Sequence, residues 1–336
     1  MLVYFAAISW CLIISYNCDK ISNSIKFISL IPFVFFSAYR GNSGSDTENY
    51  YTRFQFIEKN FDNFLNFFNE PGLPLIMKGV HFVGGDYESF AFVYAIIFVL
   101  LYFTICCRFK EYKVFLLTVG VVFFIDGLTN TLRVSMCYLF FIIATTSNKT
   151  KHPLYFVSFL FHVSSLIMIL LRFYLSKIKL KISPKMIVYI LLGAILFFVF
   201  IYGQSFILEN IPRLNDKMDA YSELKTRSFF SGLSDIYIIF CLSAVASFYN
   251  RDSYKQMAID FLIILCICIG LFIATSISMG VLRLIKICVL TLCLLPPLTK
   301  PKRNIPKFVL FVILVPYLVN FFLVVSSGNP YGKPFI

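Results

Sequence analysis

The stretch "YESFAFVYAIIFVLLYFTICC", residues 87–107, is an almost uninterrupted apolar run. At 1.5 Å per residue, a helix of this length crosses the hydrocarbon core of a bilayer, which is about 30 Å thick. The backbone finds no water there, so such a run must form a helix that satisfies its own hydrogen bonds. Similar apolar runs recur along the chain. We therefore expect an all-α fold, a polytopic integral membrane helical bundle.

The composition places the whole chain in this class of protein. Of its 336 residues, 59% are hydrophobic and only 14% are charged, whereas charged residues make up about 25% of an average soluble domain. No polar stretch is long enough to fold around a core of its own. We expect one transmembrane domain, residues 1–336, with about 10–12 membrane segments and large outer loops at about 40–86 and 204–232. The expected segments are 2–16, 25–39, 87–107, 114–125, 127–146, 154–175, 186–203, 233–249, 257–275, 281–298 and 307–325.

The net charge of +13 is sorted by loop, and this sorting predicts the orientation of the chain. Cytoplasmic loops of membrane proteins carry the excess of Lys and Arg. One topology places 18 of the 30 Lys and Arg residues in cytoplasmic loops, so the charge needs no nucleic-acid partner and none is expected. The acidic residues then fall mostly in the two long loops on the outer side. The cytoplasmic loops of this topology are 17–26, 108–113, 147–152, 172–185, 250–256 and 299–307.

This topology requires short, broken helices in the middle of the chain. The basic loops 147–152 and 172–185 both belong in the cytoplasm, yet a single apolar stretch, 154–175, separates them. His162 and the serines after it interrupt that stretch, so we expect two short helices that dip to the outer side and return. Broken helices of this kind occur where the backbone lines a cavity enclosed by protein. Segment 114–125 is likewise short for a full span.

Two further elements are expected at the outer surface. The spacing of Phe residues in 54–69 is that of an amphipathic helix lying in the interface. The segment "NEPGLPLIMKGVHF", residues 69–82, joins an acid and a Pro/Gly turn to an apolar run that is too short to span. It is interpreted as a re-entrant or interfacial element that starts at Glu70.

Arginines within apolar segments are the first candidates for a functional site, because ionisable residues in a membrane are costly and often mark a functional cavity. Arg133 opens the span that follows "FFIDGLTNTLR". It either snorkels to the interface or clamps a phosphate, since guanidinium is always charged and binds two oxygens at once. Arg283 lies three residues before Lys286 on one helical face, and it is a second candidate for a lipid phosphate.

Three other residues have a structural and a functional interpretation. Glu70 and Asp46 are each either a contact at a helix start or a carboxylate that acts as a base or orients a sugar hydroxyl. His162 is either a hydrogen-bonded helix break or a group that binds phosphate or shuttles a proton. The chain has no GxxxxGK[ST], GxGxxG or HExxH motif. We expect a substrate that is already in the membrane, with no cofactor and no metal.

Four segments in this order resemble the EpsG-like group of polysaccharide polymerases, which includes many bacterial O-antigen polymerases of the Wzy type. The first is "AYRGNSGSDTENYYTRF", with Arg40, Gly44, Asp46 and Tyr50 at the matching positions. The others are "NEPGLPLI" with Glu70, "FFIDGLTNTLRVSMCYLFFIIA" with Arg133, and "FLFHVSSLIMI" with His162. The resemblance covers about the first half of the chain. The step before Arg133 is looser here than in the family pattern, which leaves the role of Asn130 open.

The resemblance implies a glycosyltransferase of lipopolysaccharide or other polysaccharide biosynthesis in the bacterial inner membrane. It would join oligosaccharide repeat units carried on undecaprenyl diphosphate at the periplasmic face. Arginines would stabilise the diphosphate leaving group, and a carboxylate would accept the proton of the attacking hydroxyl. The catalytic candidates are Asp46, Glu70, Arg133 and His162. The substrate-binding candidates are Arg40, Gly44, Tyr50, Arg53, Tyr221, Arg227 and Arg283.

Three other functions remain open from the sequence. A flippase of the lipid-linked unit would need a basic cavity too, but it would be expected to show two related halves. A membrane acyltransferase would use His162 as base from the cytoplasmic side. An O-antigen ligase would differ only in its acceptor. The expected partners are the lipid-linked oligosaccharide and the bilayer, and a chain-length regulator protein is a further candidate.

Overall fold

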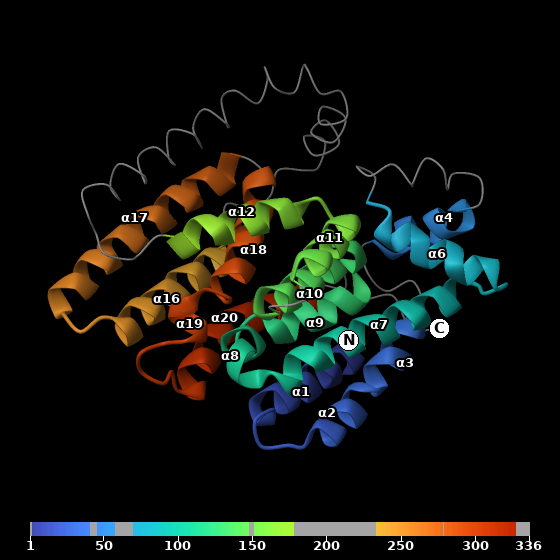
Figure 1. Ribbon diagram of the computed structural model, residues 1–336, viewed down its shortest axis with the longest axis horizontal. Coiled ribbons are helices and arrows are strands. Elements are labelled where there is room, and N and C mark those ends of the chain that lie inside the picture. Colours follow the sequence, from blue (N-terminus) through green and yellow to red (C-terminus); the bar gives the residue numbers. More distant parts are fainter. Residues whose placement is uncertain are drawn as a thin grey trace, which may run out of the picture.

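A computed structural model of the protein describes residues 2–40, 46–57, 70–147, 151–177, 233–277 and 279–326. These residues form helices joined by short turns, with no β-strand among them (Figure 1). The expected all-α fold is therefore confirmed. The expected segment 186–203, the outer loop 204–232 and all but the start of the expected helix 54–69 lie outside the described residues.

Helix α7, Tyr87–Cys107, matches the predicted segment and runs through the bundle (Figure 1). It begins at Asp86, whose carboxylate accepts the backbone N–H of Ser89 at 2.8 Å. Side chains that recur every three or four residues form one completely buried face, which packs against α3, α9 and α10. This face contains Phe90, Tyr94, Phe98, Tyr102 and Ile105.

Helices α9, Gly120–Thr129, and α10, Leu132–Thr146, meet α7 at close range. A Cβ added at Gly127 would lie 2.5 Å from Cζ of Phe98, so only glycine allows this approach. The hydroxyl of Tyr94 donates toward two carbonyl oxygens, at 2.8 Å from Gly127 and 3.1 Å from Leu132. One side chain of α7 therefore holds both sides of the break between α9 and α10.

The expected boundary between segments 114–125 and 127–146 is wrong. Helix α8, Phe109–Leu117, ends well before it, and α9 continues past it to Thr129. Asp126 lies inside α9, where its carboxylate accepts hydrogen bonds from Asn130 and Thr131 in the following turn. The chain bends instead between α8 and α9, by 77°, and a second break separates α9 from α10.

The expected interruption of segment 154–175 is confirmed. Helix α11, Lys151–Phe161, and helix α12, Ser164–Lys177, are separated by His162 and Val163. Helix α11 packs along α10, and α12 continues to α18, which belongs to the second half of the chain. The break therefore lies where the two halves of the bundle come together.

Other segments also end or break at prolines. The expected segment 25–39 is two helices joined at Ile31 and Pro32, and 281–298 divides before Pro296 because proline cannot donate a helical hydrogen bond. The helices concerned are α2, Asn23–Leu30; α3, Pro32–Ala38; α18, Met279–Leu292; and α19, Pro296–Thr299. Those that follow the prediction closely are α1, Leu2–Asn17; α16, Leu233–Asn250; α17, Tyr254–Ile277; and α20, Lys307–Ser326.

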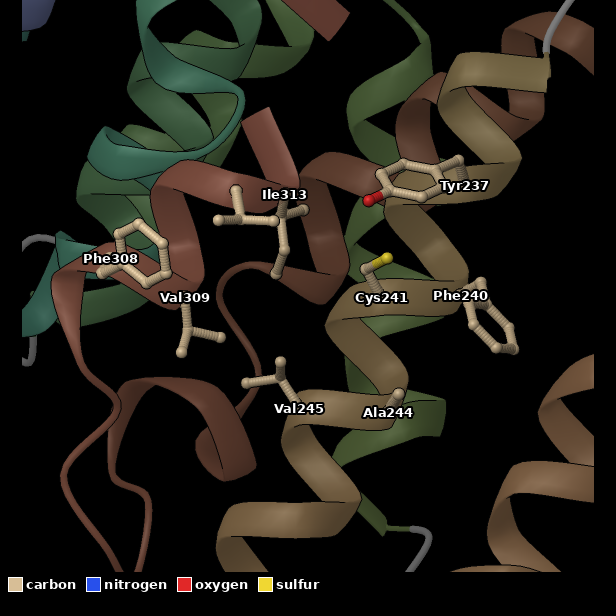
Figure 2. A pocket seen from close by; sticks show the side chains of 9 residues that line it. Tyr237, Phe240, Cys241, Ala244, Val245, Phe308, Val309 and Ile313 are labelled. Carbon is tan, nitrogen blue, oxygen red and sulfur yellow. The ribbon is translucent and has the colours of Figure 1, made fainter. Parts of the chain in front are cut away.

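The second half of the bundle is formed by α16 to α20, at the left of Figure 1. An apolar groove of about 340 Å³ lies between α16 and α20. Figure 2 shows that aromatic and aliphatic side chains line it, with Cys241 and the Tyr237 hydroxyl as its few polar atoms. Such a surface suits contact with lipid chains.

Within the described residues, α7 and α16 are long and apolar enough to cross a membrane. The bent pair of α8 and α9 adds a third span if it is counted as one. Shorter apolar helices, α1 and α10 among them, make up much of the remaining bundle. The protein is a helical membrane protein in which short and broken helices accompany the full-length ones.

Candidate functional site

Glu70 occupies an unusual backbone conformation immediately before Pro71 and helix α6, Gly72–Phe82. Its φ angle is +59°, in the left-handed region that residues other than glycine rarely adopt. The residue before a proline is restricted further, so this conformation costs on the order of 1–3 kcal/mol. The side chain is buried. Strain of this kind persists only where surrounding contacts hold it, and it is concentrated at functional sites.

The carboxylate of Glu70 receives donors from two other elements. Nη1 of Arg133, the second residue of α10, lies 2.5 Å from Oε2. The backbone N–H of Val163 donates to Oε1 at 3.3 Å, and Nε2 of His162 lies 3.5 Å from the same oxygen. Glu70 thus joins the start of α6, the start of α10 and the break between α11 and α12. The structure therefore brings together three of the predicted catalytic residues, Glu70, Arg133 and His162; their catalytic roles stay predictions.

The break between α11 and α12 determines how His162 faces Glu70. A Cβ added at Gly72 would lie 2.9 Å from the ring of Phe161, so α6 can approach the end of α11 closely only with glycine there. The backbone N–H of Ser164 donates to Nδ1 of His162 at 3.0 Å, and the Ser164 hydroxyl lies 2.7 Å from the same nitrogen. With Nδ1 as acceptor, the neutral ring carries its proton on Nε2, toward Glu70.

Helix α4, Thr47–Gln55, adds three predicted residues to this site. Asp46 precedes its first turn, and Tyr50 and Arg53 follow at intervals of four and three residues, on one helical face. Burial raises the pKa of the Tyr50 hydroxyl; nearby Arg133 acts against this shift, and Asp46 adds to it. Burial and then the charge of Arg133 lower the pKa of the Arg53 guanidinium. These groups therefore share one electrostatic environment.

We call this set the polar cluster. Its members come from four segments of the chain that the described structure brings together. The polar cluster consists of Asp46, Tyr50, Arg53, Glu70, Arg133 and His162.

Arg40 lies beside the polar cluster rather than in it. Arg40 is only 2% exposed, and its guanidinium donates to the carbonyl oxygen of Leu128 in the last turn of α9. Its Nη2 lies 3.4 Å from the hydroxyl of Tyr87, whose ring packs against that of Tyr51 on α4. Arg40 therefore ties α3 to the end of α9 beneath α4. Its contact with substrate stays a prediction.

Four predicted residues are placed only in part or not at all. Gly44, Tyr221 and Arg227 lie outside the described residues. Arg283 lies in α18, but its side chain is outside the described part. The substrate-binding roles of these residues stay predictions.

The sequence did not predict the residues whose hydrogen bonds hold together the segments around the polar cluster. Tyr94 and Tyr87 look like ordinary aromatic residues of an apolar run. Nothing in their spacing shows that Tyr94 donates hydrogen bonds to distant segments or that Tyr87 accepts one from Arg40. Asp126 carried a visible signal, an acid in an apolar stretch. Because the predicted helix boundary lies at this position, the sequence favours a loop residue there.

The chemistry of the polar cluster favours an anionic ligand. Arg53 and Arg133 lie close enough to repel one another, and an anion between them would relieve that repulsion. About a quarter of the Arg133 and His162 side chains is exposed, so a ligand can reach both. Arg133 also stands at the N-terminus of α10, where the helix dipole adds to the attraction for negative charge.

Comparison with known proteins identifies the family. The sequence model of the EpsG family matches residues 23–335, nearly the whole chain. No curated protein and no solved structure matches the chain significantly. The match confirms the resemblance drawn from the four motifs and extends it into the second half. It supports a membrane protein related to polysaccharide biosynthesis.

Proposed function

Because the chain belongs to the EpsG family, we propose that it is a polysaccharide polymerase of the Wzy type. It is a glycosyltransferase of the bacterial inner membrane that joins repeat units carried on undecaprenyl diphosphate at the periplasmic face. The observation that carries this proposal is the contact of Glu70 with Arg133 and the His162 break. Three family motifs, far apart in sequence, meet there around one strained residue.

Arg133 binds the diphosphate of the donor and stabilises the charge that develops as it leaves. Two of its features support this role. Glu70 holds one nitrogen, Nη1, while Nε is buried with no hydrogen-bond partner among the described residues. A guanidinium fixed in place before the reaction stabilises the transition state without reorganisation. Arg53 lies close enough to assist in binding the diphosphate.

Asp46 accepts the proton of the attacking hydroxyl. Glu70 is less suited to this, because donors are directed at both of its oxygens and a substrate hydroxyl would have to displace one. In the reaction, the acceptor oxygen attacks the anomeric carbon while the bond from that carbon to the phosphate oxygen breaks. The electron pair leaves with the diphosphate, and the hydroxyl proton moves to Asp46. Tyr51 of α4 is exposed, so its ring can stack on a sugar.

Substitution of Arg133 tests the proposal. Arg133→Ala should abolish chain elongation, so that surface polysaccharide shows single repeat units in place of a ladder of lengths. Arg133→Lys should restore little, because lysine keeps the charge but loses the two-pronged geometry. Electrophoresis of surface polysaccharide from cells that carry each variant measures both effects.

Arg251 provides the matched control for this experiment. It forms an ion pair with Asp260, with Nε 2.9 Å from Oδ2, in a part of the bundle outside the polar cluster. Arg251→Lys should leave the ladder intact at equal protein abundance. A full ladder from Arg133→Ala would contradict the proposed function.

A further inference from the structure

We propose that Asp126 is a positioning residue for this reaction: its carboxylate holds the break between α9 and α10 in the shape that directs Arg133 into the polar cluster. The inference rests on the proposed function of Arg133. Asp126 lies near the end of α9, seven residues before Arg133, and its carboxylate accepts hydrogen bonds from the residues between α9 and α10. Its effect would be exerted through the backbone of the break.

The hydrogen bonds of Asp126 account for the geometry of the break. The side-chain amide of Asn130 donates to Oδ1 at 2.8 Å, and the hydroxyl of Thr131 donates to Oδ2 at 3.1 Å. The backbone N–H groups of the same two residues donate to the carbonyl oxygen of Asp126, at 2.8 and 3.1 Å. Asp126 therefore binds both residues of the break through side chain and backbone together.

The same network reaches the first turn of α10. The hydroxyls of Thr131 and Ser135 lie 2.8 Å apart. Since the Thr131 proton is given to Asp126, Ser135 is the donor in this second bond. A chain of hydrogen bonds thus runs from Asp126 through Thr131 to Ser135 and brackets Arg133 on α10. Tyr94 of α7 holds the backbone of the break from the other side.

Loss of this network should displace Arg133 without removing it. A displacement of about 1 Å in a group that acts on the transition state can cost about a hundredfold in rate. We expect Asp126→Ala and Thr131→Val to reduce elongated polysaccharide by about 10- to 100-fold. Thr131→Ser keeps the hydroxyl and should restore the ladder. Thr131→Val changes little in size, so it tests the inference even where Asp126→Ala disturbs folding.

Hydrogen exchange gives a readout that does not depend on activity. Amides in the first turn of α10 should exchange faster in purified Asp126→Ala and Thr131→Val than in the unmodified protein. Asp260 is the matched control: its carboxylate accepts bonds from Ser247 and Arg251, away from the polar cluster. Asp260→Ala should leave both the ladder and exchange in α10 unchanged.

The outcomes separate the two proposals. Unmodified ladders from Asp126→Ala and Thr131→Val, with Arg133→Ala inactive, would overturn the positioning role alone. A full ladder from Arg133→Ala would overturn the function and this inference with it. Equal loss of the ladder in Thr131→Ser and Thr131→Val would also overturn the inference, since the hydroxyl would then be irrelevant.

Discussion

Glu70 shows how a single residue can combine backbone strain with side-chain contacts. Its left-handed conformation, before a proline, would normally be assigned to glycine. Glutamate is retained there with its carboxylate against Arg133 and the backbone of Val163. The contacts must therefore contribute more than the conformation costs. Without these contacts, nothing would hold Glu70 in the left-handed conformation.

In a helix, alanine is normally more stable than glycine. This balance predicts the opposite order for the alanine and glycine variants of position 70. Glu70→Ala should lower the free energy of unfolding by about 1–3 kcal/mol, because Arg133 and the Val163 N–H lose the buried carboxylate that accepts their hydrogen bonds. Glu70→Gly loses the same contacts but relieves the strain, so it should be more stable than Glu70→Ala by up to about 1 kcal/mol. Unfolding of the detergent-solubilised protein by guanidinium would measure the difference.

Position 88 supplies the control for this comparison. Glu88 is exposed in the first turn of α7, where the backbone is helical. Glycine should there be less stable than alanine, by about 0.5–1 kcal/mol. If alanine were also the more stable residue at position 70, the left-handed conformation of Glu70 would be refuted.

At the scale of an element, α7 illustrates how local and tertiary signals agree. Its apolar length predicted a span, and Asp86 with Ser89 marks its first turn. Both the backbone N–H and the hydroxyl of Ser89 donate to Oδ1 of Asp86, at 2.8 and 2.7 Å. These bonds lower the pKa of the Asp86 carboxyl below its ordinary value, with the Ser89 hydroxyl as the largest cause.

The hydrogen bonds that Asp86 accepts at the start of α7 should stabilise the protein to an extent that depends on pH. Asp86→Ala should lower the free energy of unfolding by about 1 kcal/mol at pH 7. Because the folded carboxyl has the lower pKa, its contribution is present above the unfolded pKa of about 3.9 and is lost as the pH falls through the folded value. Thermal unfolding of both proteins from pH 7 to pH 3 should show the gap closing. If the difference in stability between the two proteins stayed constant over this pH range, the ionised Asp86 carboxylate would not be what stabilises α7.

Helix breaks show where prediction from sequence succeeded and where it failed. The break at His162 was predictable, because two basic loops on one side demanded that the chain turn back between them. A helix start near Arg133 was also predictable, but the position of the break after Thr129 was not, because it depends on Tyr94 reaching across from α7 and on Gly127 packing against Phe98. Contacts between distant segments leave no periodic signal in either one of them.

The candidate site was predictable to a similar degree. The motifs identified the residues that meet at Glu70, since each is a charged or polar group in an otherwise apolar setting. They gave no indication that Arg40 would be buried against the end of α9. Length and charge predicted which polar residues gather, whereas the different positions of Arg40 and Arg133 depend on the packing of α3, α9 and α10.

At the scale of the whole molecule, the basic loops gather at one end of the bundle. Lys307 binds Asp19, and Lys113 donates to Asn304 at 3.1 Å, which joins three of these loops. Lys302 lies 2.7 Å from Asp252, which joins a fourth. These contacts support the prediction that the loops share one side of the membrane.

The remaining two basic loops start at the same end. The hydroxyl of Tyr112 is hydrogen-bonded to Thr146, and Arg172 donates to the carbonyl oxygen of Thr145 at 3.1 Å. Thr146 ends α10, whereas Arg133 stands at its beginning, about 20 Å away along the helix at 1.5 Å per residue. The polar cluster and the basic loops therefore occupy opposite ends of α10.

This separation predicts the result of reporter fusions. Since cytoplasmic loops carry the excess of Lys and Arg, the end with the polar cluster should face the periplasm. A reporter that is active only in the periplasm should be active when fused after Gly85 or Ser165, and inactive after Lys110 or Arg303. Activity assays on cells with equal amounts of each fusion would measure this. The reverse pattern would place His162 and Arg133 at the cytoplasmic face, within reach of a soluble acyl donor. A lipid-linked repeat unit presented in the periplasm could then not reach the site, and the acyltransferase interpretation would replace the polymerase.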